Sequence, residues 1–356
     1  MGSVTGILTS MGPKPLPVDD LRAVVALAQD SFASLRGARI FVTGGTGFFG
    51  HWLLESMLVA NHELGHGARA TVLTRDAARF RRESPWIDGD AAITLLEGDV
   101  RSFPFPAEQH SHIIHAATDS GGQQSESALA GDILGGTQRV LDFARHAATR
   151  RLLYVSTGAV YGRSTSLLHT PESFLADAPP LALDSYEGAK RRAEELCLQR
   201  GTMGPPVQDF PLEVVIARCF AFVGPRLPLD THFAIGNFIG AAMAGQPIHI
   251  KGDGTPRRSW LYMSDLAAWL WTMLARGEAG RAYNVGSDEG YSIAEAARLT
   301  AATLAPGVPI QIAGTPVAGA PLNSYVPSIE RARTELGLNV TVTLADALRR
   351  TAAWYR

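Results

Sequence analysis

The sequence predicts an α/β fold, with a doubly wound parallel sheet followed by a smaller C-terminal lobe. Continuous apolar runs alternate with helical patterns from Ala38 onward, which is typical of parallel strands covered on both faces. A glycine string, "TGGTGFFG", joins the first apolar run to the first long helix of this region. The alternation becomes irregular after Pro225, where we expect the second lobe to begin.

The elements of the sheet region follow one another in a regular order. Strands are expected over 38–43, 68–75, 92–100, 112–118, 151–157 and 212–225, and helices over 51–65, 137–148 and 185–200. The C-terminal lobe is expected to hold a helix, a strand, a glycine-rich turn and an aromatic-rich helix, followed by shorter helical pieces.

Three regions are expected along the chain. Residues 1–36 form an N-terminal extension with one helix, whose apolar positions recur at a spacing near 3.6. Residues 37–225 form a dinucleotide-binding Rossmann-type domain, because the glycine string lies between a strand and a helix. Residues 226–356 form mainly a substrate-binding lobe, which can also return a strand to the sheet.

Composition excludes several classes of function. The 356 residues carry a formal net charge of −2, and no dense run of Lys and Arg offers a surface for nucleic acid. No apolar run reaches the ~18–20 residues that cross a bilayer, and the N-terminus lacks the pattern of a signal peptide. We therefore expect a cytoplasmic protein that binds neither nucleic acid nor membrane. Cys197 and Cys219 are expected to be buried free thiols, although two cysteines can also form one disulfide.

A cluster of histidines raises the question of a metal. His110, His112 and His115 lie close together in "HSHIIHAA", but in a strand the third would point away from the first two. No cysteine or carboxylate at a suitable spacing completes a site. The sequence predicts no metal, and His115 is expected to be a buried histidine at a strand end.

The glycine string is expected to bind the pyrophosphate of a dinucleotide. Gly44, Gly47 and Gly50 have a G-x-x-G-x-x-G spacing, and Phe48 and Phe49, which lie within the string, are expected to contact the cofactor as well. Glycines at these positions allow a tight turn and a close approach of the backbone to a phosphate at the helix N-terminus.

The end of the second strand bears on which dinucleotide binds. An acidic residue there would bind the ribose 2′-hydroxyl of NAD, but this chain has Thr74 followed by Arg75. A guanidinium can pair with the 2′-phosphate of NADP, so NADP is slightly favoured over NAD. The alternative is that Arg75 stacks on the adenine or lies in solvent. Asp99, followed by Val100, ends the third strand, where its carboxylate can reach the adenine or cap a helix.

A tyrosine and a lysine are expected to carry the chemistry. Tyr186 and Lys190 in "SYEGAK" are four residues apart and share one face of a helix. A phenol has a pKa near 10 in water, and an adjacent ammonium would favour its phenolate and so make it a better base. A strand that ends in Ser-Thr about thirty residues earlier supplies a hydroxyl at Thr157.

Together these motifs resemble the extended short-chain dehydrogenase/reductases, in particular the NAD(P)-dependent nucleotide-sugar epimerase/dehydratase branch. The resemblance covers about 38–345 and rests on "TGGTGFFG", "GDV", "HAAT", "STGAVYG", "YEGAK", "ARCFAFVGP", "GDGTPRRSWLYMSDLA" and "YNVGS". It implies that Thr157, Tyr186 and Lys190 are catalytic and that Lys190 also holds the nicotinamide ribose. It also implies cofactor contacts from Ala116, Ala117, Thr118 and Cys219, and a homodimer built from helices near 126–147 and 186–200.

The resemblance implies a shared first step, in which Tyr186 takes a proton from a sugar hydroxyl, most often at C4, as the nicotinamide accepts a hydride. Dehydrating relatives carry an Asp-Glu pair directly after the threonine, whereas this chain has Gly158 and Ala159. Without those acids elimination is disfavoured, and a nucleotide-sugar 4-epimerase is the leading interpretation. The alternatives are an NADPH-dependent 4-keto-sugar reductase, an atypical dehydratase and a non-enzymatic nucleotide sensor.

The substrate is expected to be a nucleoside-diphosphate sugar. By position, Arg258 matches the arginine that clamps the diphosphate in relatives, and Arg257 is placed to assist. Gly158 and Ala159 are expected to line the sugar site. Asp119, which follows "HAAT", can supply a carboxylate from an unusual direction, although a capping or solvent-exposed role is the simpler interpretation.

Overall fold

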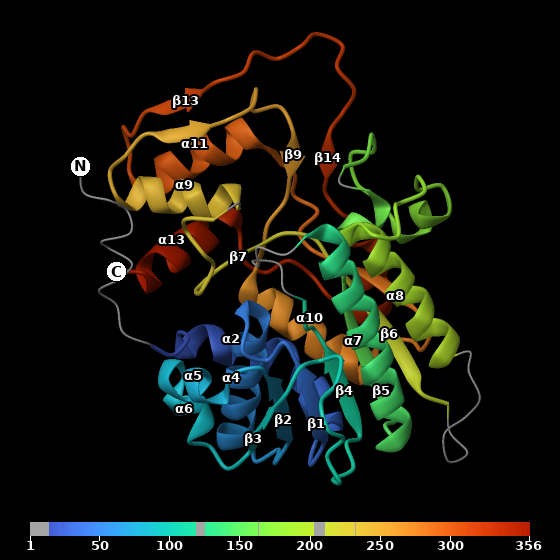
Figure 1. Ribbon diagram of the computed structural model, residues 1–356. Coiled ribbons are helices and arrows are strands. Elements are labelled where there is room, and N and C mark those ends of the chain that lie inside the picture. The colour runs from blue at the N-terminus through green and yellow to red at the C-terminus, as the bar shows by residue number, and fades with distance from the viewer. Residues whose placement is uncertain (1–13, 119–124, 163, 203–210, 232) are drawn as a thin grey trace.

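A seven-stranded parallel sheet forms the core of the larger part of the molecule, which is the lower part in Figure 1. The computed structural model describes residues 14–118, 125–162, 164–202, 211–231 and 233–356. The strands lie in the order β11-β6-β5-β4-β1-β2-β3, and every neighbouring pair is parallel. Their bounds are β1 Arg39–Thr43, β2 Arg69–Thr74, β3 Ile93–Glu97, β4 His112–His115, β5 Arg151–Thr157, β6 Glu213–Cys219 and β11 Ala282–Val285.

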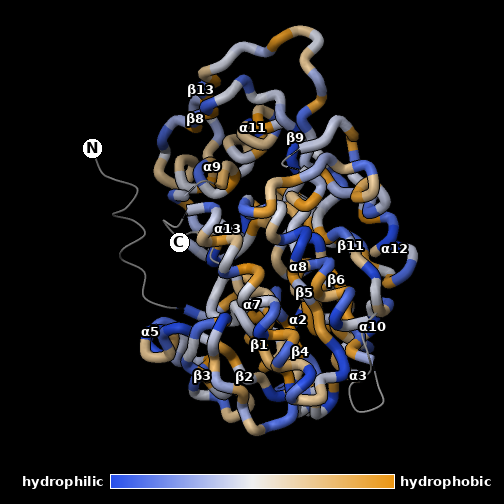
Figure 2. Tube along the Cα trace, turned by 45° about the vertical axis from the view of Figure 1, so that its right-hand side comes forward, coloured by the Kyte–Doolittle hydropathy of each residue, from blue (hydrophilic) through white to orange (hydrophobic). Residues whose placement is uncertain are grey.

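Helices cover both faces of this sheet, as its apolar strands require. One face packs against α4 (Phe48–Leu64) and α10 (Met263–Arg276), and the other against α7 (Glu126–His146) and α8 (Tyr186–Arg200). Alternate residues of a strand serve the two faces, so Val155 lies in the first core and Tyr154 in the second. Figure 2 shows hydrophobic residues concentrated along these central strands. The doubly wound sheet predicted from the sequence is confirmed.

Shorter elements complete the chain. The helices are α5 Ala77–Glu83, α6 Pro85–Asp88, α9 Ala234–Met243, α11 Ile293–Leu304, α12 Glu330–Leu336 and α13 Leu344–Trp354. Two 3₁₀ segments are η1 Gly158–Tyr161 and η2 Glu172–Ala176. The minor strands are β7 Phe222–Val223, β8 Ile248–Ile250, β9 Arg257–Arg258, β10 Leu261–Tyr262, β12 Tyr291–Ser292, β13 Ile310–Ile312 and β14 Ser324–Tyr325.

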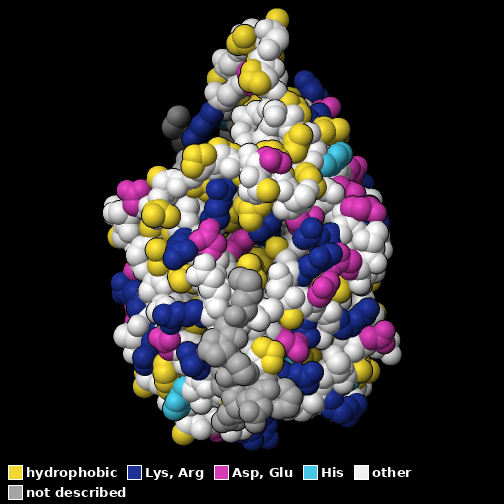
Figure 3. All heavy atoms as spheres, turned by 90° about the vertical axis from the view of Figure 1, so that its right-hand side faces the viewer, with side chains coloured by type: hydrophobic (Ala, Val, Ile, Leu, Met, Phe, Trp, Pro, Cys, Tyr) yellow, Lys and Arg dark blue, Asp and Glu magenta, His cyan; other side chains and the backbone are white. Residues whose placement is uncertain are grey.

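The C-terminal part of the chain contributes both to the sheet and to a smaller lobe. Strand β11 pairs with β6 and so forms one edge of the sheet. Strands β8 and β13 pair beside α9 and α11, and β9 lies between β12 and β14. The segment between β13 and β14 arches over this lobe in Figure 1, and Val317 and Leu322 within it are exposed. Figure 3 shows the corresponding projection at the upper end of the molecule, with hydrophobic side chains on its surface.

The N-terminal extension contains two helices, where the sequence suggested one. α2 (Val18–Leu27) and α3 (Gln29–Ser34) are separated at Ala28, whose φ of −109° and ψ of 25° are not helical. α2 packs against both α4 and α10, whereas α3 packs against α10, so the break allows the two halves to follow different surfaces. Asp20 ties α2 to the C-terminal part of the chain, because it accepts hydrogen bonds from the Tyr262 hydroxyl and from Arg350.

Two further differences concern the sheet and the helices. The strand expected over 212–225 is two strands, β6 in the main sheet and β7, which pairs with β10 outside it. The helix expected to start near 137 begins eleven residues earlier, at Glu126, where the Ser125 side chain accepts a hydrogen bond from the Ala128 N–H. Within the described residues, no helix is both long enough and apolar enough to span a bilayer.

Candidate functional site

The glycine string forms a tight turn between β1 and α4, and two of its glycines lie so close to other backbone atoms that a side chain would not fit. Gly44 has a φ of +75°, and a Cβ on it would lie 2.6 Å from the Ala116 carbonyl oxygen, at the end of the neighbouring strand β4. A Cβ on Gly50 would lie 2.1 Å from the carbonyl oxygen of Gly45. By contrast, a Cβ on Gly47 would meet only the Gly44 oxygen, at 3.4 Å. The open side of the turn is therefore at Gly47.

This turn fits the pyrophosphate of a dinucleotide. Gly47 is the N-cap of α4, and no side chain caps the helix there, so its first N–H groups remain to bind an anion. The turn lies at the switch point of the sheet, between β1 and β4, where strand order reverses and where ligands of such folds bind. The ring of His51, one turn into the helix, contacts the Gly47 oxygen and the Ser84 hydroxyl and so ties the turn to the chain after β2.

The other residues expected to bind the cofactor lie along the same edge of the sheet. Each lies at the carboxyl end of a strand or just after it. Phe48 and Phe49 follow β1, Thr74 and Arg75 are at the end of β2, Asp99 and Val100 follow β3, Ala116 to Thr118 follow β4, and Cys219 is the last residue of β6. The parallel sheet thus brings together residues that are far apart in the sequence. Their contacts with a cofactor remain predictions.

Asp99, near the end of β3, interacts with two arginines, Arg101 and Arg75. The Asp99 carboxylate accepts hydrogen bonds from the backbone and the side chain of Arg101. Arg101 also bridges to Asp132 of α7. The hydrogen bonds from Arg101 hold the pKa of Asp99 below its usual value, and the charge of Arg75 has a smaller effect in the same direction. The Asp99 side chain is therefore already engaged, and Arg75 lies within electrostatic range of it.

Thr157 ends β5 within reach of the expected base. Its hydroxyl accepts a hydrogen bond from the Ala159 N–H at 3.2 Å and lies 3.4 Å from the hydroxyl of Tyr325. Gly158 and Ala159 are buried directly after it. A Cβ on Gly158 would lie 2.8 Å from the ring of Phe220, so this position has no room for a larger residue while Phe220 keeps its place.

Tyr186 and Lys190 lie on the first turns of α8, which faces β5. The Ser185 side chain caps this helix by accepting a hydrogen bond from the Gly188 N–H. Burial raises the pKa of Tyr186 to about 12, and a hydrogen bond from Thr157 opposes that rise. The lowered pKa expected from the adjacent ammonium is thus not present in the protein alone. Lys190 donates to the Val155 oxygen at 2.8 Å, and burial lowers its pKa to about 8.

A buried polar network supports these residues from beneath. Arg218 of β6 donates to both carboxylate oxygens of Glu194, which lies one turn after Lys190 on α8. Ser156, the residue before Thr157, donates to the same carboxylate. Arg218 also donates to the Tyr161 hydroxyl, which in turn donates to Asn284 of β11. These bonds join three strands to the helix that carries the expected base.

The two arginines of strand β9 point in different directions. Arg257 donates to the Gly290 oxygen and lies 3.4 Å from Glu295 of α11. The Arg258 guanidinium lies 5.9 Å from the centre of the Tyr325 ring and donates to Asn323. Because Tyr325 reaches Thr157, Arg258 lies on the side of the residues that are expected to be catalytic. Asp119 lies outside the described residues.

His110 and His115 of the histidine cluster form hydrogen bonds with neighbouring hydroxyl groups and backbone. The ring of His115 contacts the hydroxyls of Thr43 and Thr137, and burial lowers its pKa to about 3. His110 contacts the Glu108 oxygen and the Thr71 hydroxyl. Over the part of the chain that the structure describes, no group of three His, Cys, Asp or Glu side chains could hold a metal ion. Cys197 and Cys219 are buried free thiols, as expected.

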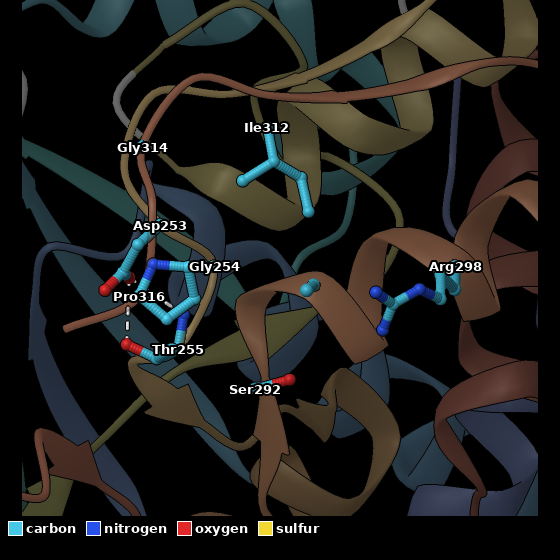
Figure 4. Close-up of a pocket in the computed structure, with 9 residues that line it drawn as sticks. Asp253, Gly254, Thr255, Ser292, Arg298, Ile312, Gly314 and Pro316 are labelled. Carbon is cyan, nitrogen blue, oxygen red and sulfur yellow. Dashed lines mark hydrogen bonds between the residues drawn. The ribbon is translucent and has the colours of Figure 1, made fainter. Parts of the chain in front are cut away.

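A separate pocket of about 410 Å³ lies in the smaller lobe (Figure 4). It is bounded by the turn at Asp253 to Thr255, by the start of α11 near Ser292, and by Ile312 and Pro316. Asp253 accepts hydrogen bonds from Thr255 within this turn, so its carboxylate is engaged. None of the residues that line the pocket is among those predicted to bind cofactor or substrate.

The sequence motifs did not indicate two aromatic residues that lie beside Thr157. The rings of Phe220 and Tyr325 pack with their centres 4.7 Å apart, and both adjoin residues of the expected site. Phe220 lies within the quoted motif "ARCFAFVGP", but Tyr325 lies in "LNSYVPS", which has no chemical signature. The pairing of β14 with β9, together with a bridge between Ser324 and Thr165, brings that tyrosine to the site.

Comparison with known proteins agrees with this arrangement. UDP-glucuronic acid decarboxylase 1 of Xenopus tropicalis is 27% identical over 320 residues, which are 89% of this chain and 72% of the relative. The crystal structure of dTDP-glucose 4,6-dehydratase from Streptomyces venezuelae, with NAD bound, superposes with a TM-score of 0.71 at 26% identity and covers 89% of this chain and 96% of its own. UDP-glucuronic acid 4-epimerase from Bacillus cereus, also in complex with NAD, has the same fold at 21% identity, with a TM-score of 0.73. The superposition covers 89% of this chain and 98% of the epimerase.

The family follows from a match that is longer than half of the chain. The family model matches residues 40–286, which extend from β1 through β11. These residues include the glycine turn, Thr157, Tyr186 and Lys190. The sequence motifs, the parallel sheet and the relatives all agree with this match. The chain belongs to the NAD-dependent epimerase/dehydratase family of enzymes.

Proposed function

We propose that this protein is a nucleotide-sugar 4-epimerase. In this reaction the C4 hydroxyl of a nucleoside-diphosphate sugar is oxidised to a ketone, which turns over and receives the same hydride on its other face. Proton and hydride both return to the sugar, so there is no net oxidation. The observation that carries the proposal is the pair Gly158 and Ala159, which are buried directly after Thr157 and provide no acid.

The residues at the ends of β5 and α8 would perform the proton transfer. Tyr186 takes the C4 hydroxyl proton, and Thr157 donates a hydrogen bond to the same oxygen. A bound nicotinamide supplies the hydride acceptor and, in its oxidised form, a positive charge that favours the phenolate. Lys190, held by the Val155 oxygen, adds a second positive charge one helical turn from Tyr186. These charges would offset the rise in the Tyr186 pKa that burial causes.

Elimination of water needs an acid for the leaving hydroxyl and a base for the C5 proton. Gly158 and Ala159 supply neither, and Phe220 leaves no space for a side chain on Gly158. Glu187, next to Tyr186, is a buried carboxylate on the helix side of the site. A dehydratase that uses Glu187 or Asp119 instead of the usual pair is therefore the alternative outcome of the test.

The test is the identity of the product. Purified protein is incubated with NAD and separately with UDP-glucose, UDP-glucuronate and dTDP-glucose, and the products are read by NMR. The proposal predicts the C4 epimer of one of these sugars, with no net reduction of NAD. A 4-keto-6-deoxy sugar would overturn it, because that product requires the elimination that the missing acids would catalyse. A decarboxylated pentose would also overturn it, because the 4-keto intermediate would then lose C6 as CO₂ instead of inverting C4.

A second candidate is the NADPH-dependent reduction of a 4-keto nucleotide sugar, and Arg75 favours it. The end of β2 carries no acid for the ribose 2′-hydroxyl, and a cation follows directly. Relatives with known structures bind NAD, so an NADP preference would distinguish this chain from them. If Arg75 binds the 2′-phosphate, Arg75→Ala weakens NADP binding about tenfold or more and leaves NAD binding unchanged. Equal effects on both cofactors would contradict this role.

Partners and location remain part of the proposal. A nucleoside diphosphate would be held by Arg258, which lies on the side of the catalytic residues, with Arg257 turned toward α11. We also propose a cytoplasmic homodimer in which α7 and α8, which pack side by side, meet the same pair of helices from a second copy. Sedimentation of the purified protein at twice the monomer mass would support the dimer, and sedimentation as a monomer would exclude it.

A further inference from the structure

Tyr325 reaches the catalytic threonine from a distant part of the chain. Its hydroxyl lies 3.4 Å from Thr157 Oγ1, although 168 residues separate the two in sequence. Thr157 ends a strand of the main sheet, whereas Tyr325 belongs to β14 beside the smaller lobe. This contact has no counterpart in the motifs that identify the family in the sequence.

The ring of Tyr325 is held on several sides. Strand β14 pairs with β9, and Tyr325 is the register partner of Arg258. The Phe220 ring packs against it at 4.7 Å, and the Arg258 guanidinium lies over it at 5.9 Å. The preceding residue, Ser324, is fully buried and exchanges two backbone hydrogen bonds with Thr165. The hydroxyl of Tyr325 is therefore presented to Thr157 by a fixed backbone and a packed ring.

The contact with Tyr325 limits which hydrogen bonds the Thr157 hydroxyl can still form. A threonine hydroxyl has one hydrogen to donate and two lone pairs to accept with. The Ala159 N–H already uses one lone pair. In the described part of the chain, Thr157 is the only hydrogen-bonding partner of the Tyr325 hydroxyl, and burial raises the pKa of Tyr325 so that it stays protonated. Either hydroxyl could be the donor in this contact, but the Tyr325 O–H is satisfied within the protein only if Tyr325 donates its hydrogen to Thr157.

We propose that Tyr325 is a positioning residue, which fills the second lone pair of Thr157 and leaves that threonine able only to donate. The single hydrogen of Thr157 then points to Tyr186 or to the reacting oxygen of the sugar. This donor role suits both steps of the proposed function, on which the inference rests: the phenolate of Tyr186 and the developing charge on the sugar oxygen are both acceptors.

The other groups that face Tyr186 are unchanged when only the Tyr325 hydroxyl is removed. They are Cys219 on β6, Tyr154 on β5, and Glu187 and Lys190 on α8 itself. Phenylalanine at position 325 keeps the ring between Phe220 and Arg258 and removes only the hydrogen-bond donor. A change in the titration of Tyr186 would therefore report the altered role of Thr157.

The test compares Tyr325→Phe with the original enzyme, using whichever of UDP-glucose, UDP-glucuronate and dTDP-glucose turns over with NAD. We expect kcat to fall about tenfold, and the acidic limb of the kcat/KM profile to move up by about one pH unit. KM is expected to change less than about twofold. Tyrosine-selective NMR of the NAD complex should show the same upward shift for Tyr186. The matched control is Tyr291→Phe, on β12 at the other edge of β9, which should leave both readouts unchanged.

A double-mutant cycle separates positioning from a direct role. In a Thr157→Val background, which lacks the hydroxyl, Tyr325→Phe should cause no further loss. A further tenfold loss there, or an unshifted pH profile in the single variant, would overturn the inference. The proposed function has its own control: if Tyr186→Phe abolishes turnover while Tyr325→Phe changes neither the profile nor kcat, only the inference about Tyr325 fails. If Tyr186→Phe keeps full turnover, the proposed function fails.

Discussion

Glu194 and Arg218 form a buried ion pair, with Oε2 and a guanidinium nitrogen 2.7 Å apart and both side chains at most 5% exposed. Glu194 lies on the helix that carries Tyr186 and Lys190, and Arg218 lies on β6. Ser156 donates to the same carboxylate from the residue before Thr157. The pair therefore connects the helix with the strand end that together build the site.

Removing one partner of this pair should destabilise the fold strongly. Glu194→Ala leaves the Arg218 guanidinium buried without its counter-charge, and we expect a loss of about 3–5 kcal/mol in the free energy of unfolding, measured by urea denaturation. The matched control is Glu195→Ala, one residue further along α8, where an exposed pair with Arg192 is lost. That change should cost about 1 kcal/mol or less. Similar losses for the two variants would contradict the structural role of the buried pair.

A substitution in the glycine turn should weaken cofactor binding without lowering the stability of the fold. Gly47→Ala adds a methyl group that meets only the Gly44 oxygen at 3.4 Å, so the fold should tolerate it. The methyl group would, however, occupy the open side of the turn, and NAD affinity should fall about tenfold or more. Titration of NAD by fluorescence measures the affinity, and thermal unfolding measures the stability.

The control for this change is Gly131→Ala in α7, where a Cβ meets nothing within 4 Å. It should leave NAD affinity unchanged and slightly raise stability, because alanine is the better helix former. Full NAD affinity in Gly47→Ala would show that the pyrophosphate does not lie against this turn.

Buried His115 should make stability fall in acid. Burial, and to a lesser degree the charge of Lys190, lower its folded-state pKa from 6.5 to about 3, so the unfolded chain takes up the proton first. Its contribution is present above pH 6.5 and is lost as the pH falls toward 3. Between about pH 7 and pH 5 this amounts to about 2 kcal/mol.

Urea denaturation at the two pH values tests this contribution. The difference in unfolding free energy should shrink by about 2 kcal/mol in His115→Asn, whatever the variant's stability at neutral pH. His249→Asn serves as the control because that side chain is exposed on β8, and it should leave the difference unchanged. An unaltered difference in His115→Asn would show that His115 does not titrate between the two states as its burial indicates.

The sheet and the positions of its motifs could be predicted from the sequence because local patterns determine them. Continuous apolar strands, the glycines of the first turn and the four-residue spacing of Tyr186 and Lys190 each carry their meaning within a few residues. The parallel order then places the motif residues along one edge. The break at Ala28 and the split of the 212–225 strand depend on packing between distant elements, which no local pattern records.

The environment of the site was less predictable than its members. The sequence suggested that Lys190 would lower the pKa of Tyr186, but burial dominates in the protein alone and raises it. Tyr325 reaches Thr157 through the pairing of β14 with β9 and the bridge between Ser324 and Thr165, which are contacts between distant parts of the chain. Desolvation and long-range strand pairing both arise from the assembled fold, and a single sequence does not display them.

The central claim is that the Tyr186 hydroxyl moves the proton in the reaction, and Tyr186→Phe tests it most directly. The kcat of the variant is measured with the nucleotide sugar that turns over, and its NAD affinity is measured in parallel. The account predicts a loss of about 10²–10⁴-fold in kcat with NAD affinity unchanged. Turnover within about twofold of the original enzyme, at unchanged NAD affinity, would contradict it.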